Sequence, residues 1–289
     1  MIIMRLTGGL GNQMFQYAFG RQLAHRHKTE LKLDASIYSD QVANVPRRTY
    51  DLGIFNISGQ IAHEDEIRRF ASWSRNKYVD KLLNRVIGLK PSHIREPHYH
   101  FSRAAMDAPD NVYVSGYWQS ERYFQDAETQ LRDEFTFRDP MCPNAGPIYD
   151  AITSTESVCV HVRRGDFLTN PLNGLHGEEY YSAGAKIVAR TNRDLSFFVF
   201  SDEIEWCREN LRFDGRTTFV DDDFGPMKFR DDLRLMSRCK HFIIANSSFS
   251  WWAVWLNRNP QRVVVAPTEW VTDKSLDTRD LYPANWIRI

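Results

Sequence analysis

The chain has 289 residues, of which 42% are hydrophobic and 26% are charged, as in an ordinary globular protein. Its lysines and arginines number 37 and its aspartates and glutamates also number 37, so no global field attracts nucleic acid or an acidic membrane. Nucleic-acid binding is therefore disfavoured, and any recognition of an anion has to be local.

Hydropathy and cysteine usage favour a soluble, cytoplasmic protein. The apolar run at the N-terminus is too short for a signal peptide, and no run of about 18 or more apolar residues could form an integral membrane span. The cysteines form no C-x-x-C pair, which argues against a structural zinc site, and a chain of this length does not need a disulfide framework. They are Cys142, Cys159, Cys207 and Cys239.

The first half of the chain begins as an alternation of strand and helix. We expect a strand at 1–6, a glycine-rich loop at 8–11, a helix at 12–27, a strand at 30–34, a turn-rich stretch at 40–62, a long polar helix at about 63–87, a strand at 111–118 and a helix at 120–135. The stretch 138–147 holds three prolines and a glycine, and is the best candidate for a linker.

The second half continues the alternation more regularly. Strands are predicted at 157–162, 195–200, 217–220, 241–245 and 262–266, and helices at 178–190, 227–239 and 248–257. A further helix should open at Ser201 or Asp202, because Asp202 and Glu205 have capping-box spacing. Apolar strands alternating with helices predict parallel sheets covered by helices. We expect two α/β domains, 1–145 and 146–289, with a cleft between them.

Two adjacent arginines end the first strand of the second half. In VCVHVRRGDF (158–167), Arg163 and Arg164 follow a buried strand, and ligands of parallel α/β sheets bind beyond the carboxyl ends of strands. Guanidinium groups match phosphate oxygens in bidentate geometry and stay charged. The pair is therefore a candidate anion site, and the alternative is a solvated turn.

A second candidate is the loop GGLGNQ at 8–13, between a strand and a helix. It resembles a phosphate-binding turn, and Asp34 at the end of the next strand nearly completes a dinucleotide fingerprint. The match fails at Met14, where glycine or alanine is needed. Asn12 is also a good N-cap, so a tight turn with a cap is the plainer interpretation. An NAD(P)-dependent oxidoreductase stays open as a less favoured alternative.

A third candidate is the start of the helix at 248–257. Ser247 and Ser248 offer hydroxyls and free backbone amides to an anion, while Trp251, Trp252 and Trp255 are expected to be core.

Two further groups of polar residues are weaker candidates. The run Asp221–Asp223 could bind a divalent metal, but looks like a solvated loop. His176, Glu178 and Glu179 could serve acid–base chemistry, or could be loop polarity at a helix N-terminus.

Three separated motifs resemble the α-1,2-fucosyltransferase family, glycosyltransferase family 11, and in particular its soluble bacterial members. They are GGLGNQMFQYA at 8–18, HVRRGDF at 161–167 and DLRLMSRCKHFIIANSSFSWWAVWLN at 232–257. The resemblance runs from the first residues to about residue 270, although 40–110 carry little of it. Phe167 stands where the family commonly has tyrosine.

The resemblance implies a GT-B enzyme with two Rossmann-like domains, which needs no metal and inverts the fucose centre. It would move L-fucose from GDP-β-L-fucose to the 2-hydroxyl of a terminal galactose, with 146–289 as the donor domain and 1–145 on the acceptor side. The partners implied are GDP-fucose and a galactose-terminated oligosaccharide. The location implied is the bacterial cytoplasm, including the inner face of the membrane where glycans are assembled.

Residue roles follow by position in the motifs. Arg163 and Arg164 match the arginines that meet the donor pyrophosphate, His161 and Asp232 match positions near the guanine, and Ser247 and Ser248 match the segment that hydrogen-bonds the phosphates. Gly9, Gly11, Asn12 and Gln13 match the loop that faces the donor from the first domain. Asp166 and His176 are both candidates for the base, and Asp166 could equally brace an arginine. A protein that binds nucleotide sugars or glycans without catalysis is the rival interpretation.

Overall fold

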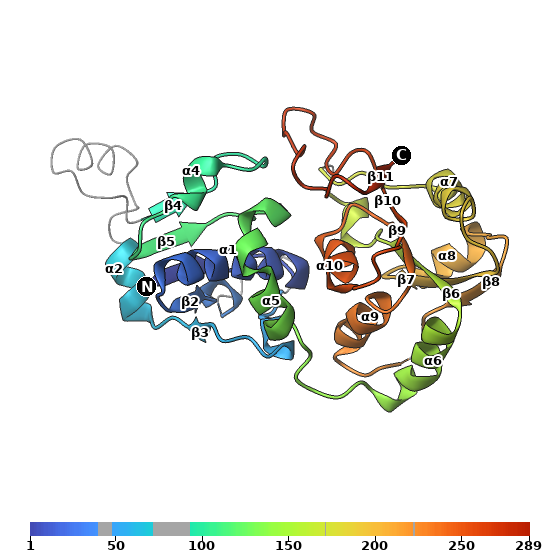
Figure 1. Ribbon diagram of the computed structural model, residues 1–289, viewed down its shortest axis with the longest axis horizontal. Helices are drawn as coiled ribbons and strands as arrows, with labels where there is room; N and C mark the ends of the chain where they lie inside the picture. Colours follow the sequence, from blue (N-terminus) through green and yellow to red (C-terminus); the bar gives the residue numbers. More distant parts are fainter. Residues whose placement is uncertain (40–47, 72–92, 171, 222) are drawn as a thin grey trace. The chain divides into compact units, whose positions relative to one another are not determined.

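The computed structural model describes residues 1–39, 48–71, 93–170, 172–221 and 223–289, and it divides into two compact units. Unit 1 is Met1–Arg138 with Asp277–Leu281, and unit 2 is Asp139–Leu276 with Tyr282–Ile289 (Figure 1). The first junction, Arg138 to Asp139, falls in the stretch expected to be a linker, ahead of the expected boundary at 145. The chain later returns to unit 1 for a short segment, 277–281, which the sequence analysis did not anticipate.

Unit 1 is built on a parallel sheet with the strand order β3-β2-β1-β5-β4. Its strands are β1 (Ile2–Arg5), β2 (Leu31–Asp34), β3 (Gln60–Ile61), β4 (His93–Arg95) and β5 (Val112–Ser115). Its helices are α1 (Leu10–His27), α2 (Glu64–Ala71), α4 (Arg103–Met106) and α5 (Glu128–Glu134). Of the polar helix expected at 63–87, α2 is confirmed, and 72–87 lie outside the described residues.

Helix α1 packs against the central strands and buries most of its length, including Met14, Phe15 and Phe19. It begins at Leu10 with Gly9 as its N-cap, so the prediction of Asn12 as the N-cap is wrong. The cause is backbone geometry: Gly8 has a φ of 78°, a conformation that favours glycine, and the chain turns into the helix directly after it.

Two predicted elements of unit 1 are shorter than expected. The strand predicted at 111–118 ends at Ser115, because Gly116 and Trp118 have φ values of 152° and 57° and turn the chain out of the sheet. The helix predicted at 120–135 is interrupted by 3₁₀ turns at Glu121–Tyr123 and Gln125–Ala127 before α5 begins. The break lies at Phe124, whose φ of −142° is not helical.

Unit 2 is a larger parallel sheet with the order β11-β10-β9-β6-β7-β8. Its strands are β6 (Glu156–Val162), β7 (Leu195–Ser201), β8 (Arg216–Phe219), β9 (His241–Ile244), β10 (Val264–Ala266) and β11 (Ile287–Arg288). Its helices are α6 (Gly146–Ser154), α7 (Glu178–Val188), α8 (Ile204–Asn210), α9 (Lys228–Met236) and α10 (Ser248–Leu256). The prediction of two α/β units with parallel sheets covered by helices is confirmed.

The central strands of unit 2 are buried on both faces, as a continuous run of apolar residues predicts. Val158, Val160 and Val162 of β6 pack with Phe197 and Val199 of β7 in one apolar core. Trp251, Trp252 and Trp255 of α10 are also buried, which confirms the expectation that they are core.

Both sheets change direction beside their first strand. The strand order reverses between β1 and β5 in unit 1, and between β6 and β9 in unit 2. At such a point the loops after the two central strands diverge to opposite faces of the sheet, and ligands of open α/β sheets bind there. Each unit therefore has one edge at which a site is expected.

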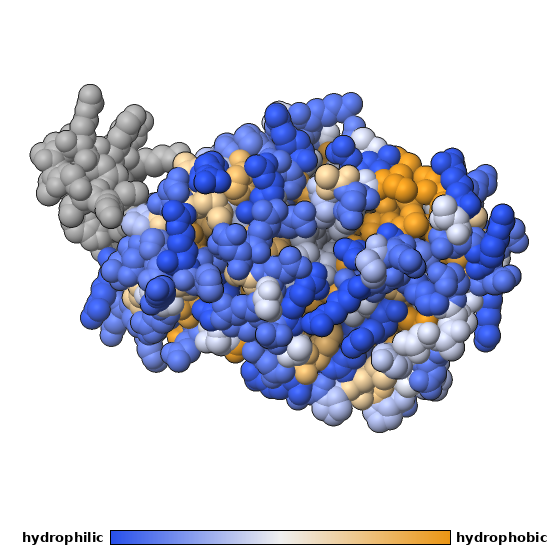
Figure 2. All heavy atoms as spheres, in the orientation of Figure 1, coloured by the Kyte–Doolittle hydropathy of each residue, from blue (hydrophilic) through white to orange (hydrophobic). Residues whose placement is uncertain are grey.

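Within the described ranges, no helix combines the length and the apolar character that crossing a membrane requires. The face shown in Figure 2 is mostly hydrophilic, with apolar residues gathered at a few places. The cysteines Cys142, Cys159, Cys207 and Cys239 are free thiols.

Candidate active site

Arg163 is held by two carboxylates at the carboxyl end of β6. Its Nε and Nη2 lie 2.9 and 2.7 Å from Oδ1 of Asp166, and its Nη1 lies 3.1 Å from Oδ2 of Asp202. The strand stays buried up to Val162 and ends where a permanent cation has to reach solvent or a charged partner. The guanidinium is thus fixed in one orientation before any ligand arrives.

Arg164 is fixed differently, by its backbone and by an aromatic ring. Its amide donates to Oδ1 of Asp202 at 3.0 Å, and its Cζ lies 3.9 Å from the ring centroid of Trp206 in α8. A guanidinium stacked on an indole keeps its edge available for in-plane hydrogen bonds. Arg164 therefore presents a fork of donors whose plane is already set.

Asp202 joins the two arginines and was not identified from the sequence as a site residue. The helix predicted to open at Ser201 or Asp202 begins at Ile204, and the expected Asp202–Glu205 capping box is wrong. The reason is that the Asp202 carboxylate is engaged by Arg163 and the Arg164 amide. Gly165 allows this approach, because a Cβ there would lie 2.7 Å from Oδ2 of Asp202. The available signal was the position of Asp202 directly after β7, the neighbour of β6.

The N-terminus of α10 lies on the adjacent strand connection. β9 pairs in parallel with β6, and the chain passes from β9 through Asn246 into α10, with Ser247 as the N-cap. The Ser247 side chain makes no capping hydrogen bond within the described part of the chain. The first amides of α10 and the partly exposed hydroxyls of Ser247 and Ser248 therefore form a partial positive site at the reversal of strand order.

Two nearly buried polar side chains lie in the same region, His161 near the end of β6 and Asn246 between β9 and α10. His161 is 6% exposed and Asn246 is 4% exposed. Burial, with a contribution from Arg163, lowers the pKa of His161 to about 3, so its imidazole is neutral. Nδ1 of His161 has no hydrogen-bond partner among the described residues, which is uncommon for a buried polar atom and indicates a ligand or water partner.

His176 precedes α7 and reaches the same region. Its ring lies 4.7 Å from the ring of Tyr180, and it contacts Asn246, the residue before Ser247. Burial lowers the pKa of His176, and the Asn246 contact opposes that shift only in part. Glu178 and Glu179 occupy the first turn of α7, where negative charge favours the helix dipole, which is the plainer of the two roles considered.

Asp232 lies on α9, where its Oδ1 accepts from Nζ of Lys228 at 3.0 Å. Burial raises its pKa to about 6, with a smaller contribution from Asp231, while Lys228 acts in the opposite direction. The neighbouring Asp231 is fully buried between Arg230 and Arg234, at 3.1 and 3.2 Å, and has a structural role. Among the described residues, Asp232 has one cationic partner where Asp231 has two, so Asp232 is the carboxyl more available to a ligand.

Asp221 and Asp223 of the aspartate run are both engaged by other groups of the protein. Asp221 forms an ion pair with Arg208, and Oδ1 of Asp223 accepts the Gly225 amide at 2.7 Å. Asp222 lies outside the described residues. In the part of the chain that the structure describes, no group of three or more His, Cys, Asp or Glu side chains is placed to hold a metal ion.

The predicted residues of the glycine loop lie in unit 1. Gly9 and Gly11 form the entry to α1, and Oδ1 of Asn12 accepts from Nε2 of Gln119 at 2.8 Å. Gln13 is fully buried; its Nε2 donates to the carbonyls of Gly8 and Thr49 at 3.1 and 2.8 Å. Gln13 thus fixes the loop, while the arginines, the serines and the histidines gather in unit 2.

The sequence of the whole chain identifies its family. The family model described as Glycosyl transferase family 11 matches residues 1–289. The chain belongs to glycosyltransferase family 11. As a member of family 11 the chain is a glycosyltransferase, and the family expected from its motifs is confirmed.

The chain is also similar to individual relatives and to solved structures. The chain is 34% identical over 302 residues to an alpha-1,2-colitosyltransferase of Escherichia coli, covering 100% of this chain and 99% of the relative. It is 26% identical over 271 residues to galactoside 2-alpha-L-fucosyltransferase Sec1 of Mus musculus, covering 89% of this chain and 64% of the relative. The structure of a mutant of FUT1 from Arabidopsis thaliana, in complex with GDP, has a TM-score of 0.52 at 14% identity, covering 88% of this chain and 68% of that one. The fold is therefore that of the GT-B fucosyltransferases.

Proposed function

We propose that this family 11 enzyme transfers a fucose-type 6-deoxy sugar, L-fucose in the first instance, from its GDP-linked form to the 2-hydroxyl of a terminal galactose, inverting the transferred centre. The observation that carries the proposal is the fixed pair Arg163 and Arg164 beside the N-terminus of α10. The α-1,2 linkage is supported by the names of both relatives, and the galactoside acceptor by that of the mouse protein.

The arginines and the helix N-terminus would act on the leaving group. Breaking the bond between sugar and phosphate adds negative charge to GDP, and donors fixed in advance stabilise that charge without reorganising. Arg163 and Arg164 offer forked donors toward phosphate oxygens, and Ser247, Ser248 and the first amides of α10 would bind the remaining ones. Asp202 would hold the side chain of Arg163 and the backbone of Arg164 in place.

The nucleoside would be bound by neutral and anionic groups at the same edge. Nδ1 of His161 has no hydrogen-bond partner within the described ranges, and the Asp232 carboxyl is only partly compensated by Lys228. A carboxylate matches the adjacent N–H donors of guanine, so Asp232 is assigned to the base and His161 to a neighbouring polar atom of the nucleotide.

The pairing of Asp166 favours one of its two possible roles. Its Oδ1 lies 2.7 Å from Nη2 of Arg163, so the carboxylate is placed to brace the arginine. The neutral imidazole of His176, beside Asn246, is then the candidate that takes the proton of the acceptor hydroxyl.

The test is release of GDP from GDP-linked fucose and from GDP-linked colitose, which lacks one fucose hydroxyl. Each donor is assayed with and without lactose or a β-1,3-linked galactoside, followed by linkage analysis of the product. Acceptor-dependent release with an α-1,2 product from fucose is expected. A product from GDP-linked colitose alone would mean that the donor sugar is colitose and not fucose. Tight GDP binding without transfer to either acceptor would contradict the proposal. The NAD(P)-dependent oxidoreductase is set aside, because the chain belongs to a glycosyltransferase family.

A further inference from the structure

A group of polar and aromatic side chains lies near the point in unit 1 where the strand order reverses. The proposed binding of the nucleotide does not involve these side chains. β1 and β5 are paired at its centre, and β4 lies beside β5. The chain leaves β5 through Gly116 and Tyr117 and leaves β4 through Glu96. By the rule that ligands of open α/β sheets bind at this point, these exits are expected to border a site.

Two tyrosine rings and a carboxyl group meet at these exits. The rings of Tyr99 and Tyr117 are stacked, with centroids 6.4 Å apart and planes 20° apart, and both side chains are half-buried. Glu96 accepts the backbone amides of Tyr117 and Trp118 at 2.6 and 2.9 Å. Burial raises the pKa of the Tyr99 hydroxyl, and Tyr117 and then Glu96 add to that shift, so all three groups share one environment.

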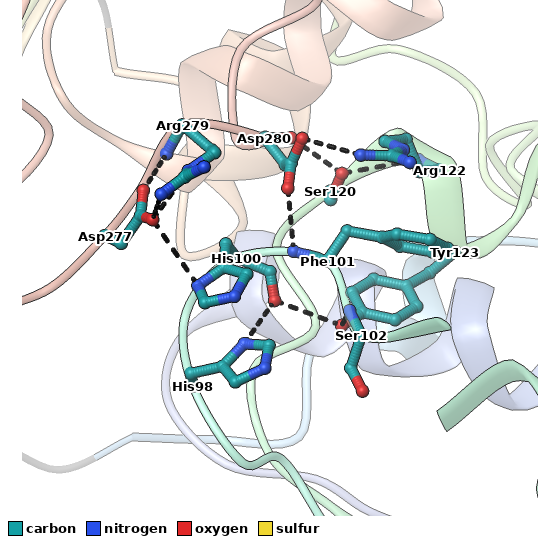
Figure 3. Close-up of polar contacts among 10 residues, drawn as sticks. All are labelled: His98, His100, Phe101, Ser102, Ser120, Arg122, Tyr123, Asp277, Arg279 and Asp280. Atoms are coloured by element: carbon teal, nitrogen blue, oxygen red, sulfur yellow. Dashed lines mark hydrogen bonds and ion pairs between the residues drawn. The ribbon is translucent and has the colours of Figure 1, made fainter. Parts of the chain in front are cut away.

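The segment that carries Tyr99 is fixed at both ends. Glu96 ties its start to the exit of β5, and at its end the Ser102 amide donates to the Tyr123 hydroxyl at 2.7 Å. The Phe101 amide donates to Oδ2 of Asp280 at 3.0 Å, and Oδ1 of Asp280 pairs with Arg122 at 2.7 Å (Figure 3). Asp280 comes from the returning segment 277–281, which Figure 3 shows lying against the loop of His98 to Ser102.

The composition of this group indicates the kind of ligand. Aromatic rings pack on the C–H faces of sugars and give affinity at little conformational cost, because tyrosine has few rotatable bonds. A carboxyl group beside them accepts from hydroxyls and repels phosphate. Gln119 and Asn12 add neutral side-chain amides next to the glycine loop, where Nε2 of Gln119 donates to Oδ1 of Asn12 at 2.8 Å. A neutral, polyhydroxylated ligand fits these residues, and a nucleotide does not.

We propose that Tyr99, Tyr117 and Glu96 form the subsite that binds the terminal galactose of the acceptor, held in shape by Asp280. This inference rests on the proposed transferase function and deepens it. The rings would pack on one face of the sugar and so orient it. Glu96, whose carboxyl group is fixed by hydrogen bonds from two backbone amides, would accept a hydrogen bond from a sugar hydroxyl.

The first experiment compares Tyr99→Ala, Tyr99→Phe and the matched control Tyr149→Ala, a half-buried tyrosine of α6 in unit 2. Acceptor KM and kcat are measured at saturating donor, and GDP affinity by calorimetry. Removing one ring that packs on the sugar should raise acceptor KM about tenfold or more, while GDP affinity stays within about twofold. Tyr99→Phe should raise acceptor KM less than Tyr99→Ala, and Tyr149→Ala should leave it unchanged. Acceptor KM unchanged in Tyr99→Ala overturns the inference.

A second experiment does not depend on how the alanine variants fold. The protein is labelled with 3-fluorotyrosine, and the resonances of Tyr99, Tyr117 and Tyr149 are assigned from single Phe substitutions. Saturating lactose or β-1,3-galactoside in the presence of GDP should shift the Tyr99 and Tyr117 resonances and not that of Tyr149. Transfer to a galactoside without any such shift overturns the subsite alone. A shift without transfer leaves the subsite standing and removes the proposed function.

Discussion

The guanidinium of Arg164 lies over the indole of Trp206, with Cζ 3.9 Å from the ring centroid. This contact comes from the first turn of the helix after β7, whereas Arg164 follows β6, so it links the two strand exits. Stacking orients the guanidinium plane, and a plane is what bidentate binding of phosphate oxygens requires. The contribution of Arg164 to phosphate binding is therefore expected to depend on the planar shape of its guanidinium as well as on its charge.

Arg164→Ala should lower turnover by about 10²–10³ with the fold retained, the usual loss for one donor to a developing anion. Arg164→Lys should recover little, because an ammonium neither stacks nor binds in bidentate fashion. Trp206→Leu should cost about tenfold, consistent with a cation–π contact of 1–2 kcal/mol. Steady-state kinetics at saturating acceptor measure these effects, with the exposed Arg193→Ala as control. Turnover at the wild-type level in Arg164→Ala contradicts the assignment.

Asp166 and Asp202 both contact Arg163, which allows a direct comparison of bracing with base catalysis. If both carboxylates only brace the arginine, Asp166→Asn and Asp202→Asn should each lower kcat by about 10- to 100-fold, the usual effect of a bond to a charged group. Both variants should keep the wild-type dependence of kcat on pH. Loss of turnover in Asp166→Asn together with a changed pH profile, not shared by Asp202→Asn, would make Asp166 the base.

Asp232 should make stability depend on pH. Its pKa is raised from 3.8 to about 6 by burial, so below pH 3.8 it is protonated in the folded and unfolded chains alike. Between pH 3.8 and about 6 the unfolded chain is ionised while the folded chain keeps its proton, so the folded state loses stability across this range and no more above it. Asp232→Asn should therefore raise the free energy of unfolding by about 1–3 kcal/mol more at pH 7.5 than at pH 3.5.

Urea denaturation at the two pH values measures this difference. The control is Asp150→Asn, an exposed carboxyl in α6, whose effect should be the same at both. An equal effect of Asp232→Asn at pH 3.5 and 7.5 would show that Lys228 compensates the buried charge fully.

Asp280→Ala should destabilise unit 1 by about 1–3 kcal/mol, mainly through the Phe101 amide that loses its acceptor. The ion pair with the half-exposed Arg122 contributes less, because solvent screens it. Limited proteolysis should cut 277–281 faster, and acceptor KM should rise because the Tyr99 segment loosens. Asp273→Ala is the control, since its side chain bonds Ser275 two residues away. Unchanged proteolysis and unchanged acceptor KM would show that Asp280 does not hold the loop.

Sugar transfer is expected to proceed in excess EDTA. In the proposed mechanism the positive charge toward the leaving GDP would come from Arg163, Arg164 and the amides of α10, which a chelator does not remove. The measurement is acceptor-dependent GDP release with and without EDTA, followed by addition of Mg²⁺ or Mn²⁺. Release that stops with EDTA and returns with metal would give Asp221 and Asp223 a metal-binding role.

The alternation of strands and helices in unit 2 could be predicted because its central strands are short, almost continuous apolar runs. Arg163, Arg164, Ser247 and Ser248 could be singled out as candidates for the same reason, because they lie shortly after such runs. Asp202 and Trp206 were not found, because their role depends on β7 lying beside β6, which the residues around them do not encode.

Unit 1 was harder to predict, since its strand exits depend on backbone conformation. Nothing in NVYVSGYW announces that the strand stops at Ser115, yet the positive φ values of Gly116 and Trp118 decide where Tyr117 lies. Asp280 illustrates a second limit. Its contacts to Phe101 and Arg122 join residues far apart in the chain, and a polar segment without periodicity carries no local sign of its partner.

The return of 277–281 to unit 1 also bears on how this enzyme could be recombined with others. A chimaera made by exchanging residues 1–138 alone would join a foreign Phe101 and Arg122 region to the native Asp280, with no guarantee that they match. A graft of unit 1 therefore has to carry two pieces, 1–138 and 277–281. For the same reason, a single cut cannot release either half of this protein as an intact folding piece.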